Sequence, residues 1–339
     1  MIHNFGVEFA KLIRLKSLGM SMVPVIGAIS VNIYLSLPDF IVLFFIGILI
    51  NAVGFMLNDL IDIKRDKESP EFLERSLVKG FLTNRFVKRV IVFFILLTLF
   101  SVILYYQNFI AFLVLLIGSG LGIIYDIYSK KIYGSDIFLA MAFALFCLFG
   151  MLTQSLKLSN FSIILLFLVF FQVLYFNVIE GGLKDAYNDR NTKSKTIAVK
   201  FGVVTVPEVR IPLKFTLLTI ALEGIVFCLS ISPFLLIPKI YQFESWFISL
   251  GFIVVIGISY IFTMFKMLKI KFFQRDSIRY IIGVQELKRY LNYLGFLSVI
   301  TGFFWPIILI SVPIFWALVW MFIFKFLYRH PLPRTSKLL

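Results

Sequence analysis

Cysteine, histidine and charge are all scarce in this chain. Only two cysteines and two histidines occur among its 339 residues. Cys147 and Cys228 fall in different apolar runs without metal-ligand spacing, so neither a disulfide framework nor a zinc site is expected. His3 and His330 lie in the terminal tails. A metal site in this protein would therefore be built from oxygen ligands.

The shortage of charge indicates a membrane protein. Charged residues make up 15% of the chain and hydrophobic residues 60%, and the mean hydropathy is +0.97. A bilayer core of roughly 30 Å needs about 20 apolar residues per helix. Candidate spans lie near 17–37, 40–61, 86–106, 109–126, 136–156, 161–180, 213–236, 246–267, 290–310 and 311–327. The sequence predicts one all-α domain over 1–339, a polytopic membrane helical bundle of nine or ten transmembrane helices without a cleavable signal.

The distribution of positive charge orients these spans. Of 33 lysines and arginines, only Lys157 and Lys239 fall in the short loops on one side. Because positive loops stay in the cytoplasm, the N-terminus and the long basic loops are expected to be cytoplasmic in a multi-pass cell-membrane protein. The net charge of +15 is then mainly a topology signal, and no nucleic-acid partner is expected.

Three aspartates follow the second apolar run. Asp59, Asp62 and Asp66 share one helix face, since their spacing is i, i+3 and i+7. Three like charges so close together repel one another and favour a bound cation. Oxygen ligands without nearby nitrogen or sulfur favour Mg²⁺, which commonly shares its coordination with phosphate.

A second acidic pair follows the sixth run. Asp185 and Asp189 are spaced i, i+4 and again share a helix face. Both acidic groups fall on the basic side of the predicted topology, close in sequence to lysines and arginines. Metal ions bridging carboxylates and phosphate oxygens, with basic side chains neutralising the remaining charge, would suit a diphosphate. A lipid-soluble tail would run back between the helices.

These motifs, in this order, resemble those of the UbiA-type intramembrane prenyltransferases, with a first-motif loop similar to that of archaeal members. The first motif matches NDxxDxxxD, and the loop after it resembles the continuation RPLxxG. The fourth run ends in a Tyr–Lys loop typical of the family. The matching residues are Asn58, Asp59, Asp62, Asp66, Arg75, Tyr125, Lys130, Lys131, Asp185 and Asp189, with Arg14 as the N-terminal arginine. The resemblance covers roughly 10–205, and 206–339 is expected to supply the C-terminal spans that complete the bundle.

The resemblance implies a mechanism. Family members bind an isoprenyl diphosphate with Mg²⁺ between the two aspartate motifs and ionise it to an allylic cation, which an acceptor attacks. It assigns the metal and the catalysis to Asp59, Asp62, Asp66, Asp185 and Asp189, and substrate binding to Asn58, Arg14, Arg75, Lys130, Lys131, Lys184 and Tyr125. Ser76 and Gly182 depart from the family pattern, and the interval between Asp66 and Arg75 is long. A lipophilic acceptor and an aromatic, quinone-type acceptor therefore both stay open.

Several of these residues have a second interpretation. Lys130 and Lys131 could act as topology determinants, and Asn58 could cap a helix instead of binding a ligand. Glu180 and Glu223 are two further candidate site residues. Glu180 lies at the end of the sixth span, where a glutamate is more often interfacial than catalytic. Glu223 falls in the middle of a span, where an ionisable group marks a functional site by default. It could bind the acceptor, accept a proton, or hydrogen-bond to a neighbouring helix in its neutral form.

Two other functions share some of this pattern. A related branch resembles phosphoribosyl transfer to a polyprenyl phosphate and has a similarly long first loop with a proline at the position of Pro70. Ser69 stands where that branch has histidine, and the second aspartate pair favours an isoprenyl diphosphate. A cation-coupled transporter is the third possibility. Its acidic sites would lie near the middle of the membrane, whereas these lie at the ends of spans.

Overall fold

Helices account for nearly all regular structure in the computed structural model, which describes residues 2–14, 19–68, 73, 75–205, 208–270, 275–312 and 314–315. Across these residues the only extended pairing is an isolated antiparallel bridge between Val204 and Arg210. The elements are α1 (Ile2–Leu12), η1 (Gly19–Met22), α2 (Val23–Val31), α3 (Leu37–Glu68), α4 (Asn84–Tyr105), α5 (Phe109–Tyr128), α6 (Asp136–Gln154), α7 (Asn160–Tyr175), η3 (Phe176–Gly181), α8 (Gly182–Asn191), α9 (Ile197–Lys200), α10 (Leu213–Leu236), η4 (Pro238–Gln242), α11 (Trp246–Leu268) and α12 (Arg275–Thr301). The predicted all-α fold is confirmed.

Seven helices in the described part of the chain are long and apolar enough to cross a membrane. They are Leu37–Glu68, Asn84–Tyr105, Phe109–Tyr128, Asp136–Gln154, Asn160–Asn191, Leu213–Leu236 and Trp246–Leu268. Each corresponds to one predicted span. Capping residues begin three of them: Thr83, Asn108 and Ser159 accept backbone N–H groups from the first turns of α4, α5 and α7. Such caps satisfy donors that a helix start leaves unpaired.

The predicted count of nine or ten spans is not confirmed. The span expected at 17–37 is wrong as one helix, because α2 covers only Val23–Val31 and the chain is non-helical from Asn32 to α3. The span expected at 290–310 is also wrong as one helix. Its first part belongs to α12, which begins fifteen residues earlier, and a turn with Gly302 at φ 61° interrupts it. The span expected at 311–327 lies almost entirely outside the described residues.

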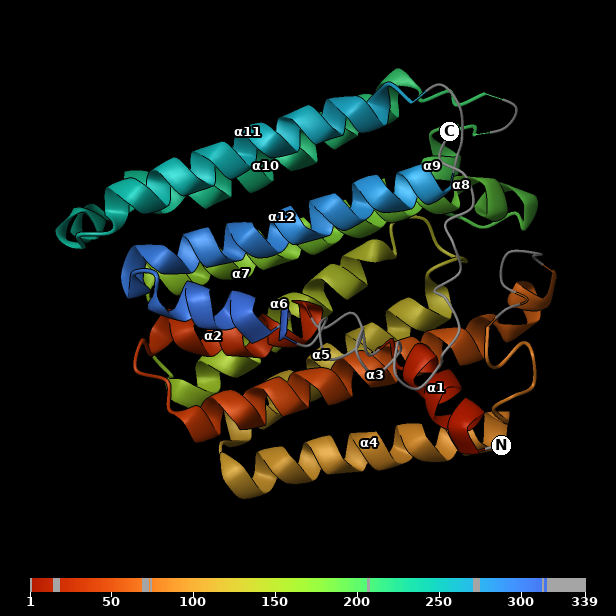
Figure 1. Ribbon diagram of the computed structural model, residues 1–339, viewed down its shortest axis with the longest axis horizontal. Coiled ribbons are helices and arrows are strands. Elements are labelled where there is room, and N and C mark those ends of the chain that lie inside the picture. Colours follow the sequence, from red (N-terminus) through yellow and green to blue (C-terminus); the bar gives the residue numbers. More distant parts are fainter. Residues whose placement is uncertain are drawn as a thin grey trace.

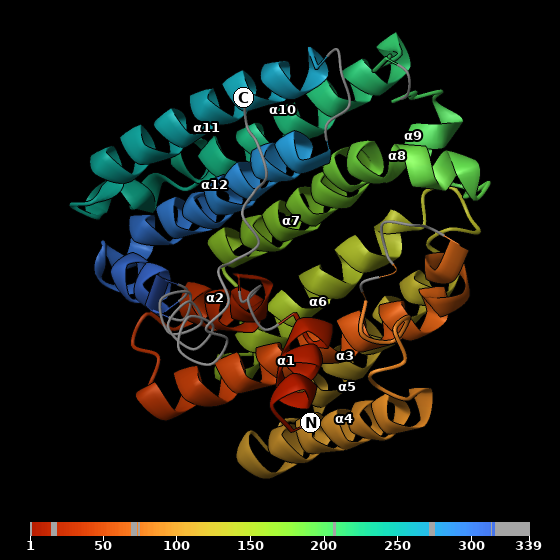
Figure 2. The same ribbon diagram turned by 45° about the vertical axis from the view of Figure 1, so that its right-hand side comes forward.

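The long helices run side by side as a bundle (Figure 1). Helix α3 and the continuous segment α7–η3–α8 each have 32 residues. At 1.5 Å per residue such a helix is about 48 Å long, well beyond a hydrocarbon core of roughly 30 Å. Both extensions lie at the same end of the bundle in Figures 1 and 2. The two predicted aspartate motifs are on these extensions, so the fold brings them to one membrane surface.

The short helix α2 is the most deeply buried element. Residues 23–30 are all buried, and α2 packs against α6 and α7. Glycines allow this approach: a Cβ on Gly27 would lie 2.1 Å from the Cys147 carbonyl oxygen, and one on Gly150 would lie 1.9 Å from that of Pro24. Small residues at helix crossings allow close backbone packing inside membranes. This contact fixes the N-terminal helices against the centre of the bundle.

Candidate active site

The first aspartate motif lies on the last turns of α3. Asp59 and Asp66 are buried, and Asp62 is half-buried. Arg75, from the loop after α3, donates from Nη1 to Oδ1 of Asp59 at 3.1 Å and also donates to Asp66. Nη2 of Arg14 lies 3.6 Å from the same oxygen of Asp59. Two arginines from outside α3 therefore converge on its acidic face.

Arg14 connects the N-terminal helix to this cluster. Its guanidinium lies 4.2 Å from the centre of the Phe55 ring, over the face of the ring. Its backbone is left-handed, with φ 47°, a conformation that non-glycine residues adopt sparingly. Ser76 donates a hydrogen bond to the carboxylate of Glu8 in α1, which adds a second connection. Helix α1 is thus held beside the aspartates.

Asp126 is a buried carboxylate that the motif comparison missed. It lies on α5, is 9% exposed and has Asn58 as a side-chain hydrogen-bond partner. Asp62 and Asp59 act on it electrostatically. Asn58 therefore contacts a neighbouring helix, and it does not cap α3 because it lies inside that helix and at neither end. An aspartate inside an apolar run, directly after the motif tyrosine, was the available signal.

The second motif lies on α8. Asp189 is buried, and its Oδ1 accepts from Nζ of Lys130 at 2.6 Å. Asp185 is half-buried, with Nζ of Lys184 3.6 Å from its Oδ2. Burial alone would lower the pKa of Lys130, but the charges of Asp189 and Asp185 and the hydrogen bond to Asp189 raise the pKa above its ordinary value. Lys130 is therefore firmly cationic and tied to the second aspartate motif.

Side chains between the two motifs join them into one site. Tyr125 lies within electrostatic reach of Asp62 in the first motif and Asp185 in the second. The negative charge of Asp185 also interacts with the Arg14 guanidinium, and that of Asp62 interacts with the Lys130 ammonium. Five predicted site residues from four parts of the chain thus share one electrostatic environment. Alternating carboxylates and cations of this kind suit a polyanionic ligand.

Lys131 behaves differently from its neighbour. It is exposed, and its ammonium lies 5.9 Å from the centre of the Tyr128 ring. It makes no ion pair with a carboxylate in the part of the chain that the structure describes. Of the three lysines assigned to substrate binding, Lys130 and Lys184 therefore lie beside aspartates of the second motif, whereas the ammonium of Lys131 lies beside the ring of Tyr128.

The ligand atoms that the site offers fit a hard divalent cation. All candidate ligands are carboxylate oxygens, as Mg²⁺ prefers. Oδ2 of Asp189 is buried without a hydrogen-bond partner, so one ligand atom is unused. Among the described residues, however, no three Asp, Glu, His or Cys side chains already group closely enough to hold an ion. Arg75 and Lys130 supply the positive charge instead.

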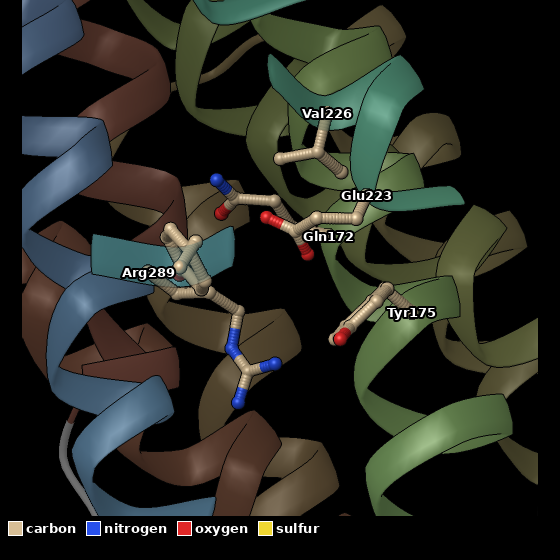
Figure 3. Close-up of a pocket in the computed structure, with 6 residues that line it drawn as sticks. Gln172, Tyr175, Glu223, Val226 and Arg289 are labelled. Atoms are coloured by element: carbon tan, nitrogen blue, oxygen red, sulfur yellow. The ribbon is translucent and has the colours of Figure 1, made fainter. Parts of the chain in front are cut away.

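A second polar region lies deeper in the bundle. Gln172, Tyr175, Glu223, Val226, Tyr260 and Arg289 line a small internal pocket (Figure 3). Both amide atoms of Gln172 and the hydroxyl of Tyr175 are buried without hydrogen-bond partners. Figure 3 shows Gln172, Tyr175 and Glu223 turned into the same space. Glu223 is therefore buried beside polar side chains, in keeping with its unusual position in the sequence.

Glu180 lies beside this pocket region and is fully buried, at 0% exposed, so the expectation that it is interfacial is wrong. Arg289 of α12 donates to both of its carboxylate oxygens, at 2.9 and 2.6 Å. Arg289 was not among the predicted site residues, and it directly precedes the span predicted at 290–310. The pair is seen only in the structure, where α12 packs against the segment α7–η3–α8.

Comparison with known proteins identifies the fold and the family. A family model described as the UbiA prenyltransferase family matches residues 21–271. A solved UbiA homologue from Archaeoglobus fulgidus bound to GPP and Mg²⁺ is 17% identical, with a TM-score of 0.64 over 86% of this chain and 99% of that one. A structure described as digeranylgeranylglyceryl phosphate synthase is 20% identical, with a TM-score of 0.63 over 88% and 99%.

The UbiA homologue from Aeropyrum pernix K1, solved in its apo form, is 16% identical, with a TM-score of 0.58 over 80% of this chain and 96% of that one. No curated protein matches the sequence. The structural similarities establish the fold, and the family model extends over most of the chain, including both aspartate motifs. The chain belongs to the UbiA prenyltransferase family.

Proposed function

We propose that this protein transfers an isoprenyl group from a prenyl diphosphate to a lipophilic or aromatic acceptor, of lipid-pathway or quinone type, in an Mg²⁺-dependent reaction. One observation carries the proposal. Two acidic clusters on separate helix extensions meet at one end of the bundle, and Arg75 and Lys130 lie among their carboxylates. The solved homologue with GPP and Mg²⁺ has the same fold, which supports the same donor class here.

The aspartates would hold the metal. Asp59, Asp62 and Asp66 would act from α3, and Asp185 and Asp189 from α8. Divalent cations bound there would neutralise charge that develops on the departing diphosphate. The unused Oδ2 of Asp189 is one ligand atom available without breaking a contact.

The basic side chains would exchange partners on donor binding. Arg75 and Lys130 now contact carboxylates, and each would turn to phosphate oxygens while the carboxylates turn to the metal. The bond between the prenyl C1 and the diphosphate oxygen then breaks, and both bonding electrons leave with the diphosphate. The acceptor adds to the allylic cation and loses a proton. Contacts that strengthen as charge develops lower the barrier to this ionisation.

A labelled-donor assay tests the proposal. Purified protein in nanodiscs is incubated with labelled farnesyl or geranylgeranyl diphosphate, Mg²⁺ and a lipid extract, and products are separated by mass spectrometry. We expect Mg²⁺-dependent donor consumption and a prenylated product whose mass identifies the acceptor. Turnover unaffected by EDTA would contradict the metal mechanism. Activity with phosphoribosyl diphosphate and a polyprenyl phosphate, and none with isoprenyl diphosphates, would replace the proposal.

We also propose that this end of the bundle faces the cytoplasm. The loops at this end contain most of the basic residues, whereas Lys157 lies in a short loop between α6 and α7. In a variant without native cysteines, a cysteine in place of Lys195 should react only after the membrane is permeabilised. One in place of Lys157 should react with an impermeant maleimide in intact cells. The reverse labelling pattern would overturn the orientation.

A further inference from the structure

A buried ion pair lies directly behind the second aspartate motif. Glu180 is 0% exposed and Arg289 is 8% exposed, and the two hydrogen bonds between them have lengths of 2.9 and 2.6 Å. The guanidinium also lies 4.5 Å from the centre of the Phe176 ring. A two-pronged contact of this kind fixes orientation as well as distance, because the planar fork of arginine matches a carboxylate.

The pair lies where the helix changes its geometry. Glu180 belongs to η3, a π-helical segment over Phe176–Gly181, and α8 begins at the next residue. A π-helical turn contains an extra residue, so it rotates the faces that follow relative to those that precede it. Glu180 can therefore face α12 inside the bundle while Asp185 and Asp189, five and nine residues later, face the cytoplasmic site.

The other side of α8 is also fixed. A Cβ on Gly182 would lie 3.1 Å from the Cβ of Ala198 in α9, so the two helices pack closely. The backbone N–H of Ser194 donates to the carbonyl of Asp189 at 2.7 Å, and that of Lys195 donates to the carbonyl of Lys130 at 2.9 Å. Helix α8 is therefore held by α9 and the Lys130 loop on one side and by Glu180 and Arg289 from inside the bundle.

A contribution to stability does not by itself explain why these two positions hold an ion pair. A buried ion pair is often no more stabilising than well-packed apolar residues of the same volume, since both charges lose their hydration. An apolar pair, however, would not fix the orientation of the α7–α8 junction relative to α12 as a two-pronged contact does. Figure 3 shows Arg289 on the opposite side of the internal pocket from Tyr175, so the arginine reaches across from α12 to the η3 segment.

We propose that Glu180 is a positioning residue that acts through Arg289. The pair anchors the junction between α7 and α8 to α12 and so holds Asp185 and Asp189 at the angle needed to bind metal with the donor diphosphate. This inference rests on the proposed function, because it assigns the metal to these aspartates. Residues that orient metal ligands typically change metal affinity by about 10- to 100-fold when they are replaced.

The test measures metal binding directly as well as turnover. Mn²⁺, as a stand-in for Mg²⁺, is titrated by EPR in the presence of a non-hydrolysable prenyl thiodiphosphate. We expect Glu180→Gln to weaken Mn²⁺ binding at least about tenfold and to raise the Mg²⁺ concentration for half-maximal turnover similarly. The KM for the acceptor should not change. The exchange of Glu180→Arg with Arg289→Glu should recover part of the loss.

Glu244→Gln is the control, because it makes the same chemical change at an exposed position between η4 and α11, away from the pair. It should leave Mn²⁺ binding unchanged. Arg289→Lys keeps the charge but loses the fork, so it gives a milder variant if Glu180→Gln fails to fold, and it should weaken Mn²⁺ binding several-fold. A folded Glu180→Gln protein with a lower melting temperature but unchanged Mn²⁺ affinity would overturn the inference. Wild-type protein that binds no Mn²⁺ and consumes no donor would instead overturn the proposed function.

Discussion

Two adjacent lysines provide a sharp test of the site geometry. Lys130 donates to Asp189 at 2.6 Å, whereas Lys131 is exposed, with its ammonium over the ring of Tyr128. Replacing either lysine with methionine removes one positive charge from the same loop. General attraction of an anionic donor therefore falls equally in both variants, and any difference between them reports direct contact.

The expected size of that difference follows from the contact. A hydrogen bond to a charged group contributes about 1.5–3 kcal/mol, and about 1.4 kcal/mol corresponds to a tenfold change in affinity. Lys130→Met should therefore weaken donor binding about 10- to 100-fold. Lys131→Met should change it by less than about fivefold, since exposed charges contribute about 1 kcal/mol or less.

Donor affinity is measured by titrating labelled prenyl thiodiphosphate in the presence of Mg²⁺, with melting temperatures recorded for both variants. Lys130→Met also leaves Asp189 without its cation, so a lower melting temperature is expected for that variant. Equal losses of donor affinity in the two variants would refute the geometry. A larger loss in Lys131→Met would show that the exposed lysine is the phosphate ligand.

Further predictions concern the first cluster and the helix packing. Arg75→Met leaves the carboxylates of Asp59 and Asp66 without their shared cation, so the melting temperature should fall in metal-free buffer and recover in part with Mg²⁺. Equal responses of wild type and variant to Mg²⁺ would contradict this. Gly150→Ala places a Cβ where only 1.9 Å separates it from a carbonyl oxygen, whereas a Cβ on Gly120 meets nothing within 4 Å. Gly150→Ala should destabilise the fold by about 1–3 kcal/mol and Gly120→Ala should not, as measured by thermal unfolding.

Apolar run length predicted the long helices well. The predicted span at 213–236 coincides with α10, and the predicted span at 109–126 differs from α5 by two residues at one end. The pattern failed at α2, which has only nine helical residues within an apolar run of ordinary span length. Hydropathy measures how apolar a segment is, and the close contacts of Gly27 and Gly150 that bury α2 depend on helices far apart in sequence.

The site was predictable where motifs and topology agree. Asp59 and Asp189 meet basic partners at one end of the bundle, as the shared side of their loops implied. The pair of Glu180 and Arg289 could not be predicted, because 109 residues separate its members and no local spacing relates them. Asp126 was visible in the sequence as a carboxylate in an apolar run, but only the structure shows its contact with Asn58.

The central claim is that the two acidic clusters act together on one diphosphate. The most direct measurement is the Mg²⁺-dependent release of diphosphate from labelled prenyl diphosphate by wild type, Asp62→Ala and Asp185→Ala. Asp39→Ala is the control, because Asp39 lies at the opposite end of α3. We predict that each cluster variant abolishes release while Asp39→Ala retains it. Release that persists in either cluster variant at the wild-type rate would contradict the account.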